Sequence, residues 1–136
     1  MSSVTFAARV AAMALPVCLS SMDSVRAAEG FPFGMEMTLD AARLPGSKRV
    51  PDLDIGEDGG VVLELWCKGG KGQFSVAGNT VIFVAGQIED RGCPANKAQL
   101  DDELVAALGE ATTWNRQGDY VSFIGSKTLR FRINTN

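Results

Sequence analysis

Apolar and polar residues alternate with a period of two through most of the chain beyond residue 34, and no other feature limits the fold as strongly. Such alternation is typical of β-strands that turn one face to a core and the other to water. The alternating segments include 35–40, 61–67, 73–77, 80–84, 120–124 and 128–133. We therefore expect about seven short strands.

Turn-forming residues separate these segments at short intervals. Asp58-Gly59-Gly60 precedes the segment 61–67, in which Cys67 falls on the core-facing side, and Gly78-Asn79 separates 73–77 from 80–84. Gly and Asn tolerate the positive φ of tight hairpin turns, so neighbouring strands should pair antiparallel. The fold class that follows is α+β, mostly antiparallel β, in a partly open barrel or curved sheet with one helix packed against it.

The helix is expected between Asn96 and Gly109. Asn96 can cap the first turn, with Gln99 three residues later, and Gly109 is suited to end the helix. An apolar face at helical spacing is formed by Leu100, Leu104, Val105 and Leu108. Acidic residues favour the positive end of a helix dipole, so we interpret the acids of the first turns as solvated rather than catalytic. These acids are Asp101, Asp102 and Glu103.

Residues 1–27 have the pattern of a signal peptide. Arg9 precedes an apolar run from Val10 to Leu19, which is too short to span the roughly 30 Å of a bilayer core. Val25-Arg26-Ala27 fits a small-residue cleavage site, so the mature domain is predicted to comprise residues 28–136. Without a further apolar run long enough to span a membrane, the mature protein is expected to be periplasmic or secreted.

A second processing route competes with simple cleavage. Leu15-Pro16-Val17-Cys18 has the outline of a lipobox, in which Cys18 would receive a lipid anchor and make the protein an outer-membrane lipoprotein. Val17 stands where a small residue is normally required, which favours the unlipidated product.

Export changes how the cysteines are interpreted. Of the three cysteines, Cys18 leaves with the signal peptide, and Cys67 and Cys93 remain as a pair in an oxidising compartment. A disulfide between them is the leading interpretation. Two buried free thiols or a redox pair are the alternatives, although the spacing is far from Cys-x-x-Cys.

Composition excludes several classes of function. The chain has no histidine, which removes the commonest general base and zinc ligand. Its net charge of −3 becomes about −4 without the first 27 residues, and no basic stripe is present, so we expect no nucleic-acid partner. We predict no enzymatic activity, no catalytic or metal-binding residues and no cofactor.

Few residues offer a binding site. Trp66, Trp114 and Tyr120 could form a partner- or ligand-binding surface, although aromatic residues in a small domain more often fill the core. The segment Lys68 to Gly72 lacks the Ser or Thr and the following helix of a phosphate-binding loop, so it is interpreted as a strand connection. The acids between Asp52 and Asp58 have the wrong spacing for a calcium loop.

The order of these elements resembles the META-domain, or HslJ-like, family of bacterial envelope proteins over roughly residues 63–133. The resemblance is carried by Leu65-Trp66-Cys67, the hairpin 72–81, Cys93-Pro94 before the helix, Thr113-Trp114, Gln117-Gly118-Asp119 and the ending 127–132. It implies a small antiparallel β structure with one helix for residues 28–136. It also implies a stress-associated protein without established enzymatic activity.

Two functional hypotheses follow. The first is an exported, non-enzymatic envelope protein with a stress-response or interaction role, whose partner would be another envelope protein. The second is a small-ligand-binding or inhibitor module that uses a sheet face or the mouth of the barrel.

Overall fold

The structure is a computed structural model that describes residues 11–16 and 30–135. Residues 11–16 are exposed and irregular, and the predicted cleavage site and the lipobox residue Cys18 lie outside the described residues. The strands are β1 (Met35–Leu39), β2 (Asp52–Ile55), β3 (Gly60–Glu64), β4 (Gly69–Ala77), β5 (Thr80–Glu89), β6 (Thr113–Gln117), β7 (Tyr120–Ile124) and β8 (Thr128–Ile133), with one helix, α1 (Ala95–Glu110).

The strands form a closed barrel in sequence order, each antiparallel to the next. Closure occurs where β1 meets β8, with Met37 opposite Ile133. The predicted antiparallel β architecture with one packed helix is confirmed. Within residues 30–135 the barrel has eight strands rather than the seven expected. The sheet closes fully because β1 pairs with β2 along one edge and with β8 along the other.

The barrel interior is filled by side chains from alternate strand positions. Phe123 lies at its centre, with ring centroids 5.3 Å from Phe74 and 5.8 Å from Phe131, while Phe31 packs edge-on against Trp114. An eight-stranded barrel is just wide enough for side chains to fill, so these rings occupy the volume that a ligand would need.

Two strands differ from their predicted limits. β3 ends at Glu64, and the next residues form a turn in which the Leu65 nitrogen donates to the Lys68 carbonyl, so Cys67 is half-buried in a loop and does not face the core. The segment predicted as a connection instead begins β4 at Gly69. It can do so because a Cβ at Gly70 would lie 2.2 Å from the Gln87 carbonyl oxygen, so only glycine permits this pairing.

The second hairpin is also longer than predicted. β5 continues to Glu89, and its residues Ile82 and Val84 are exposed on the outer face. The inward positions Val81 and Phe83 carry the buried apolar surface of this strand.

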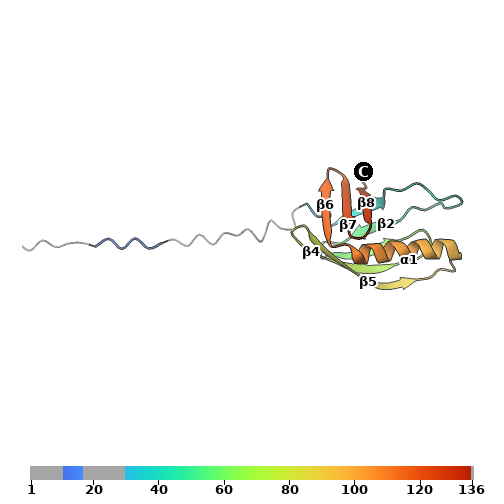
Figure 1. Ribbon diagram of the computed structural model, residues 1–136, viewed down its shortest axis with the longest axis horizontal. Coiled ribbons are helices and arrows are strands. Elements are labelled where there is room, and N and C mark those ends of the chain that lie inside the picture. The colour runs from blue at the N-terminus through green and yellow to red at the C-terminus, as the bar shows by residue number, and fades with distance from the viewer. Residues whose placement is uncertain (1–10, 17–29, 136) are drawn as a thin grey trace, which may run out of the picture.

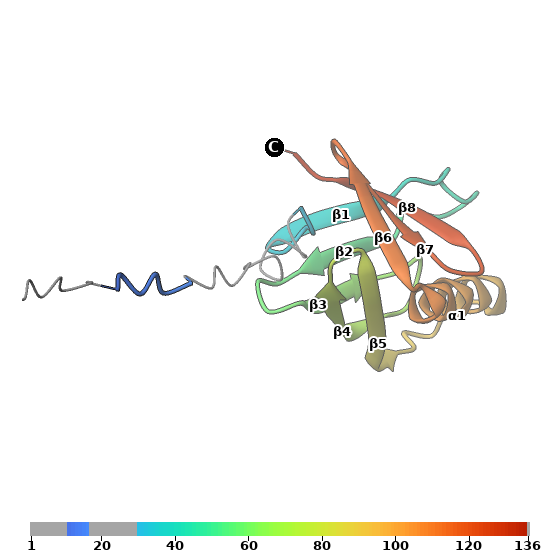
Figure 2. The ribbon, with the colours of Figure 1, turned by 60° about the vertical axis from the view of Figure 1, so that its left-hand side comes forward.

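Helix α1 closes one end of the barrel. It crosses beneath the ends of β6, β7 and β8 (Figure 1), and a turned view shows it at the mouth of the barrel beside β5 (Figure 2). Its N-cap is Pro94 without a side-chain hydrogen bond, so the predicted Asn96 cap is wrong, and Gly109 lies inside the helix. Leu104 and Leu108 are buried against the barrel, as predicted. In the part of the chain that the structure describes, no helix has the length and apolarity to cross a membrane.

Candidate functional site

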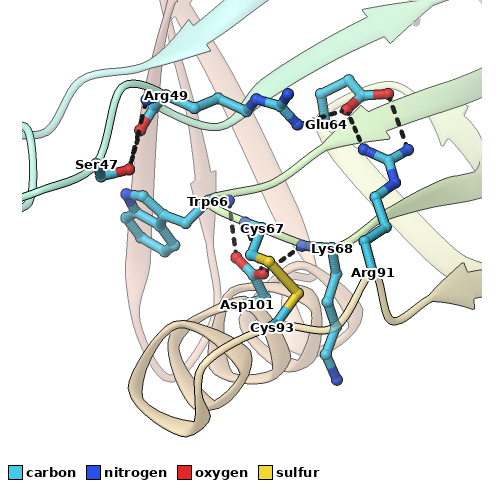
Figure 3. Close-up of polar contacts among 9 residues, drawn as sticks. All are labelled: Ser47, Arg49, Glu64, Trp66, Cys67, Lys68, Arg91, Cys93 and Asp101. Atoms are coloured by element: carbon cyan, nitrogen blue, oxygen red, sulfur yellow. Dashed lines mark hydrogen bonds and ion pairs between the residues drawn. A yellow bond between two sulfur atoms is a disulfide. The ribbon is translucent and has the colours of Figure 1, made fainter.

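A disulfide joins the loop after β3 to the segment before α1. Cys67 and Cys93 are bonded to each other, with Cα atoms 5.8 Å apart (Figure 3). The structure therefore contains the disulfide that was the leading interpretation of the two cysteines, and the two are not free thiols. The bridge ties the segment before the helix to the loop after β3, at the end of the barrel that α1 closes.

The Asp101 carboxylate holds the same loop from the helix side. It accepts hydrogen bonds from the backbone nitrogens of Trp66, Cys67 and Lys68, at 2.8, 3.0 and 2.7 Å (Figure 3). Asp101 is completely buried, so the prediction that it is solvated is wrong. Three donors satisfy a charge that would otherwise be costly to bury.

Asp102, the next residue, behaves as predicted for a surface acid. Its carboxylate is exposed and accepts a bond of 2.9 Å from Lys68 Nζ, which also lies 4.0 Å from Asp90. The hydrogen bond to Asp102 raises the pKa of Lys68. A hydrogen bond from the Cys93 backbone nitrogen lowers the pKa of Asp90, and the nearby Lys68 lowers it further.

Two arginines bind one glutamate at the end of β3. Arg91 and Arg49 lie 2.9 and 3.1 Å from Glu64 Oε2 (Figure 3). The Arg91 hydrogen bond holds the pKa of Glu64 below its usual range, with smaller contributions from the charges of both arginines. This group connects the loop after β1, the end of β3 and the segment before α1.

Trp66 is the aromatic side chain at this end of the barrel. It is half-buried, and its backbone nitrogen is one of the three that Asp101 binds. Its indole extends away from the disulfide toward Ser47 (Figure 3). The indole Nε1–H is buried and has no acceptor among the described residues, an arrangement that costs about 1–3 kcal/mol in folded proteins.

Two surface hollows meet at Trp66. The first, called here the apolar hollow, has a volume of about 150 Å³ and lies between α1, β8 and the end of β1. Its lining residues are Leu39, Trp66, Leu100, Glu103, Leu104, Ala107, Lys127 and Leu129.

The second, called here the basic hollow, has a volume of about 370 Å³. It lies between the loop after β1, the loop after β3 and the start of α1, and four of its side chains are cationic. Its lining residues are Gly46, Ser47, Lys48, Arg49, Trp66, Cys67, Arg91 and Lys97.

The three aromatic residues predicted as one surface lie in different places. Trp114 is in the core, where Nε1 donates to the Gly78 carbonyl at 2.8 Å, so it is not part of an exposed aromatic surface. Tyr120 is exposed at the start of β7, and the Arg130 guanidinium lies 4.5 Å from its ring centroid. Of the three, Trp66 lines both hollows beside α1.

Two of the acids between Asp52 and Asp58 accept hydrogen bonds within the fold. Asp58 accepts a bond from the Gly60 nitrogen at 2.9 Å in the turn before β3, and Asp52 accepts one from the Thr38 hydroxyl. Within residues 11–16 and 30–135, no group of three or more cysteine and acidic residues is arranged to hold a metal ion.

Residue patterns missed most of this site. The lysines of the basic hollow, Lys48 and Lys97, belong to no motif. Asp101 does leave a signal, because it lies three residues before Leu104 and seven before Leu108, on the apolar face of the helix. A charged residue at a buried helical position requires partners, here the amides of the loop after β3.

Comparison with known proteins adds information on the fold. No protein-family model matches the chain, and no curated protein matches it. An NMR structure of a protein from Burkholderia xenovorans is similar, with a TM-score of 0.63 and 14% identity over 98% of this chain and 100% of that chain. A second NMR structure has a TM-score of 0.57 and 16% identity over 74% of this chain and 89% of that one. At these identities the likeness shows a shared fold alone.

Proposed function

We propose that this chain is an exported, non-enzymatic binding protein of the bacterial envelope that acts through the barrel end around Trp66. The observation that carries the proposal is the contrast between a barrel interior packed with phenylalanine rings and two hollows that share Trp66 on the surface. A filled interior favours recognition on the surface, and a partly buried tryptophan is a common anchor of such contacts.

The sequence supports the location and the biological setting of this role. The signal-peptide pattern of residues 1–27 and the disulfide both suit the periplasm or the exterior. The resemblance to META-domain proteins leads us to place the function in stress tolerance, with another envelope protein as partner. A lipid anchor at Cys18 is the less favoured form of the same proposal.

Photo-cross-linking in living cells tests this function. A photoreactive amino acid at Lys97, in the basic hollow, should give a discrete cross-linked product in the envelope fraction. The same amino acid at Arg132, which is exposed on β8 outside both hollows, should not. Equal products from both positions, or none from either, would contradict a binding role for the Trp66 end. A deletion strain exposed to heat and antibiotics tests the stress-tolerance role separately.

One observation favours a small-ligand module as second candidate. The basic hollow, at about 370 Å³, falls within the range of about 300–1,000 Å³ common for small-molecule sites. Its four cationic side chains would select an anionic ligand. Titration with inorganic phosphate, followed by the chemical shifts of the residues around the hollow, tests this candidate.

A further inference from the structure

We propose that the two hollows around Trp66 bind an extended acidic segment of a partner protein that carries one apolar side chain beside its acids. This inference rests on the proposed function and names the chemistry of the partner. The apolar side chain would enter the apolar hollow, the acids would face the basic hollow, and Trp66 would lie between them.

The size of the apolar hollow selects a single side chain. Its volume of about 150 Å³ is below the range of about 300–1,000 Å³ of most small-molecule sites, and it is too small for an acyl chain. Leu100, Leu104 and Leu129 supply apolar walls on α1 and β8. Pockets of this kind accept single anchor residues at protein interfaces.

The charge of the neighbouring hollow selects acids. Arg49 and Arg91 share the single carboxylate of Glu64, and neither forms a second ion pair within the described residues. Lys48 and Lys97 form no ion pair within residues 11–16 and 30–135. The chain as a whole has a net charge of −3, whereas four side chains of the basic hollow are cationic. This local positive charge attracts anionic groups.

The loop that carries Trp66 is held in place before a partner binds. Asp101 holds the backbone nitrogen of Trp66, and the Cys67–Cys93 disulfide holds the next residue. Little conformational entropy is therefore lost in this loop when a partner binds. The indole of Trp66 lines both hollows, so a segment that fills them would contact its ring.

Fluorescence anisotropy with dye-labelled peptides tests the proposal on the purified, oxidised chain expressed from the full sequence. The probe is acetylated Glu-Glu-Leu-Glu-Glu. Two matched peptides remove one feature each, with Ser in place of Leu and with Lys in place of Glu. We expect each change to weaken binding about tenfold, and we expect added salt to weaken the binding of the first peptide.

Protein variants locate the binding site. The Lys48→Glu, Lys97→Glu double variant should bind the acidic peptide about tenfold more weakly, and Trp66→Leu should also lose affinity. Arg132→Glu reverses an exposed charge on β8 outside both hollows and should keep full affinity. Thermal unfolding of each variant separates lost binding from lost folding. If Trp66→Leu unfolds, the double lysine variant, which changes no core residue, still tests the binding site.

Four results would overturn the proposal. They are equal binding of the serine peptide, equal binding of the lysine peptide, unchanged affinity of the double lysine variant, and failure of the acidic peptide to bind while inorganic phosphate or phosphatidylglycerol vesicles do. If the peptide fails but cross-linking at Lys97 still yields a product absent at Arg132, the binding function stands and only the partner chemistry is wrong. If both fail, both proposals are wrong.

Discussion

The Asp101 carboxylate accepts a 3.0 Å hydrogen bond from the backbone nitrogen of Cys67, the residue whose sulfur is bonded to Cys93 at the start of the same helix. The loop after β3 is therefore held to α1 twice, once by a covalent bond and once by a buried charge. Because Trp66 precedes Cys67 and shares the same carboxylate, both attachments position the indole between the two hollows.

Removing the Asp101 carboxylate should destabilise the protein far more than removing its neighbour. Asp101→Ala leaves three backbone donors without their acceptor and should cost about 3 kcal/mol. Asp102→Ala removes an exposed ion pair with Lys68 and should cost less than about 1 kcal/mol. Urea denaturation of both variants measures the difference. Equal losses would mean that the carboxylate of Asp101 does not hold the loop.

Loss of the disulfide should lower stability by a comparable amount. The bridge closes a loop with a sequence separation of 26 residues, for which the chain-entropy treatment gives about 3–4 kcal/mol. The Cys67→Ser, Cys93→Ser double variant should show this loss in urea denaturation. Adding Asp101→Ala to it should cost less than in the parent, because the two attachments hold one loop. Full additivity would contradict this coupling.

Stability should fall in acid as the carboxylates at this end are protonated. Glu64 and Asp90 have lowered pKa values in the folded chain, so their contribution is present above their unfolded pKa and is lost as the pH falls through the folded one. The decline should begin below about pH 5. Denaturation curves for the parent and the Glu64→Gln, Asp90→Asn variant should show a shallower decline in the variant. Parallel declines would contradict the assignment.

Two glycines should respond in opposite directions to the same substitution. Gly70→Ala places a methyl group 2.2 Å from the Gln87 carbonyl oxygen and should cost about 1–3 kcal/mol, since the two backbones must separate. Gly109→Ala adds a methyl group to an exposed helical position with no atom within 4 Å and should stabilise by about 0.5–1 kcal/mol. Thermal denaturation tests the pair. A stable Gly70→Ala variant would show that β4 and β5 do not pair closely there.

The local pattern predicted the strands well, and tertiary contacts explain the differences. Alternation marked the core positions of β7, for example, where Val121 and Phe123 are buried. It did not predict that β1 pairs with β8, because strand closure depends on residues almost a hundred positions apart, such as Met37 and Ile133. The local pattern does not predict Gly70 in a strand for a related reason, since its place there depends on the close approach of β5.

The candidate site was harder to predict than the fold. Residue type identifies Trp66 as a candidate surface residue, but it identifies Trp114 equally, because type alone does not separate a core indole from a surface one. Lys48 and Lys97 come together with Trp66 only after the barrel has closed and α1 has crossed its mouth. Such convergence of distant loops leaves no spacing pattern in the sequence.

The most direct test of the account follows the indole N–H signals of the two tryptophans in proton–nitrogen NMR spectra as the acidic leucine peptide is added. The Trp66 signal should move, because its indole lines both hollows and a bound peptide changes its surroundings. The signal of Trp114, a core residue whose Nε1–H donates to the Gly78 carbonyl, should stay in place. A Trp66 signal that stays fixed at saturating peptide, or equal movement of both signals, would contradict binding at the Trp66 end.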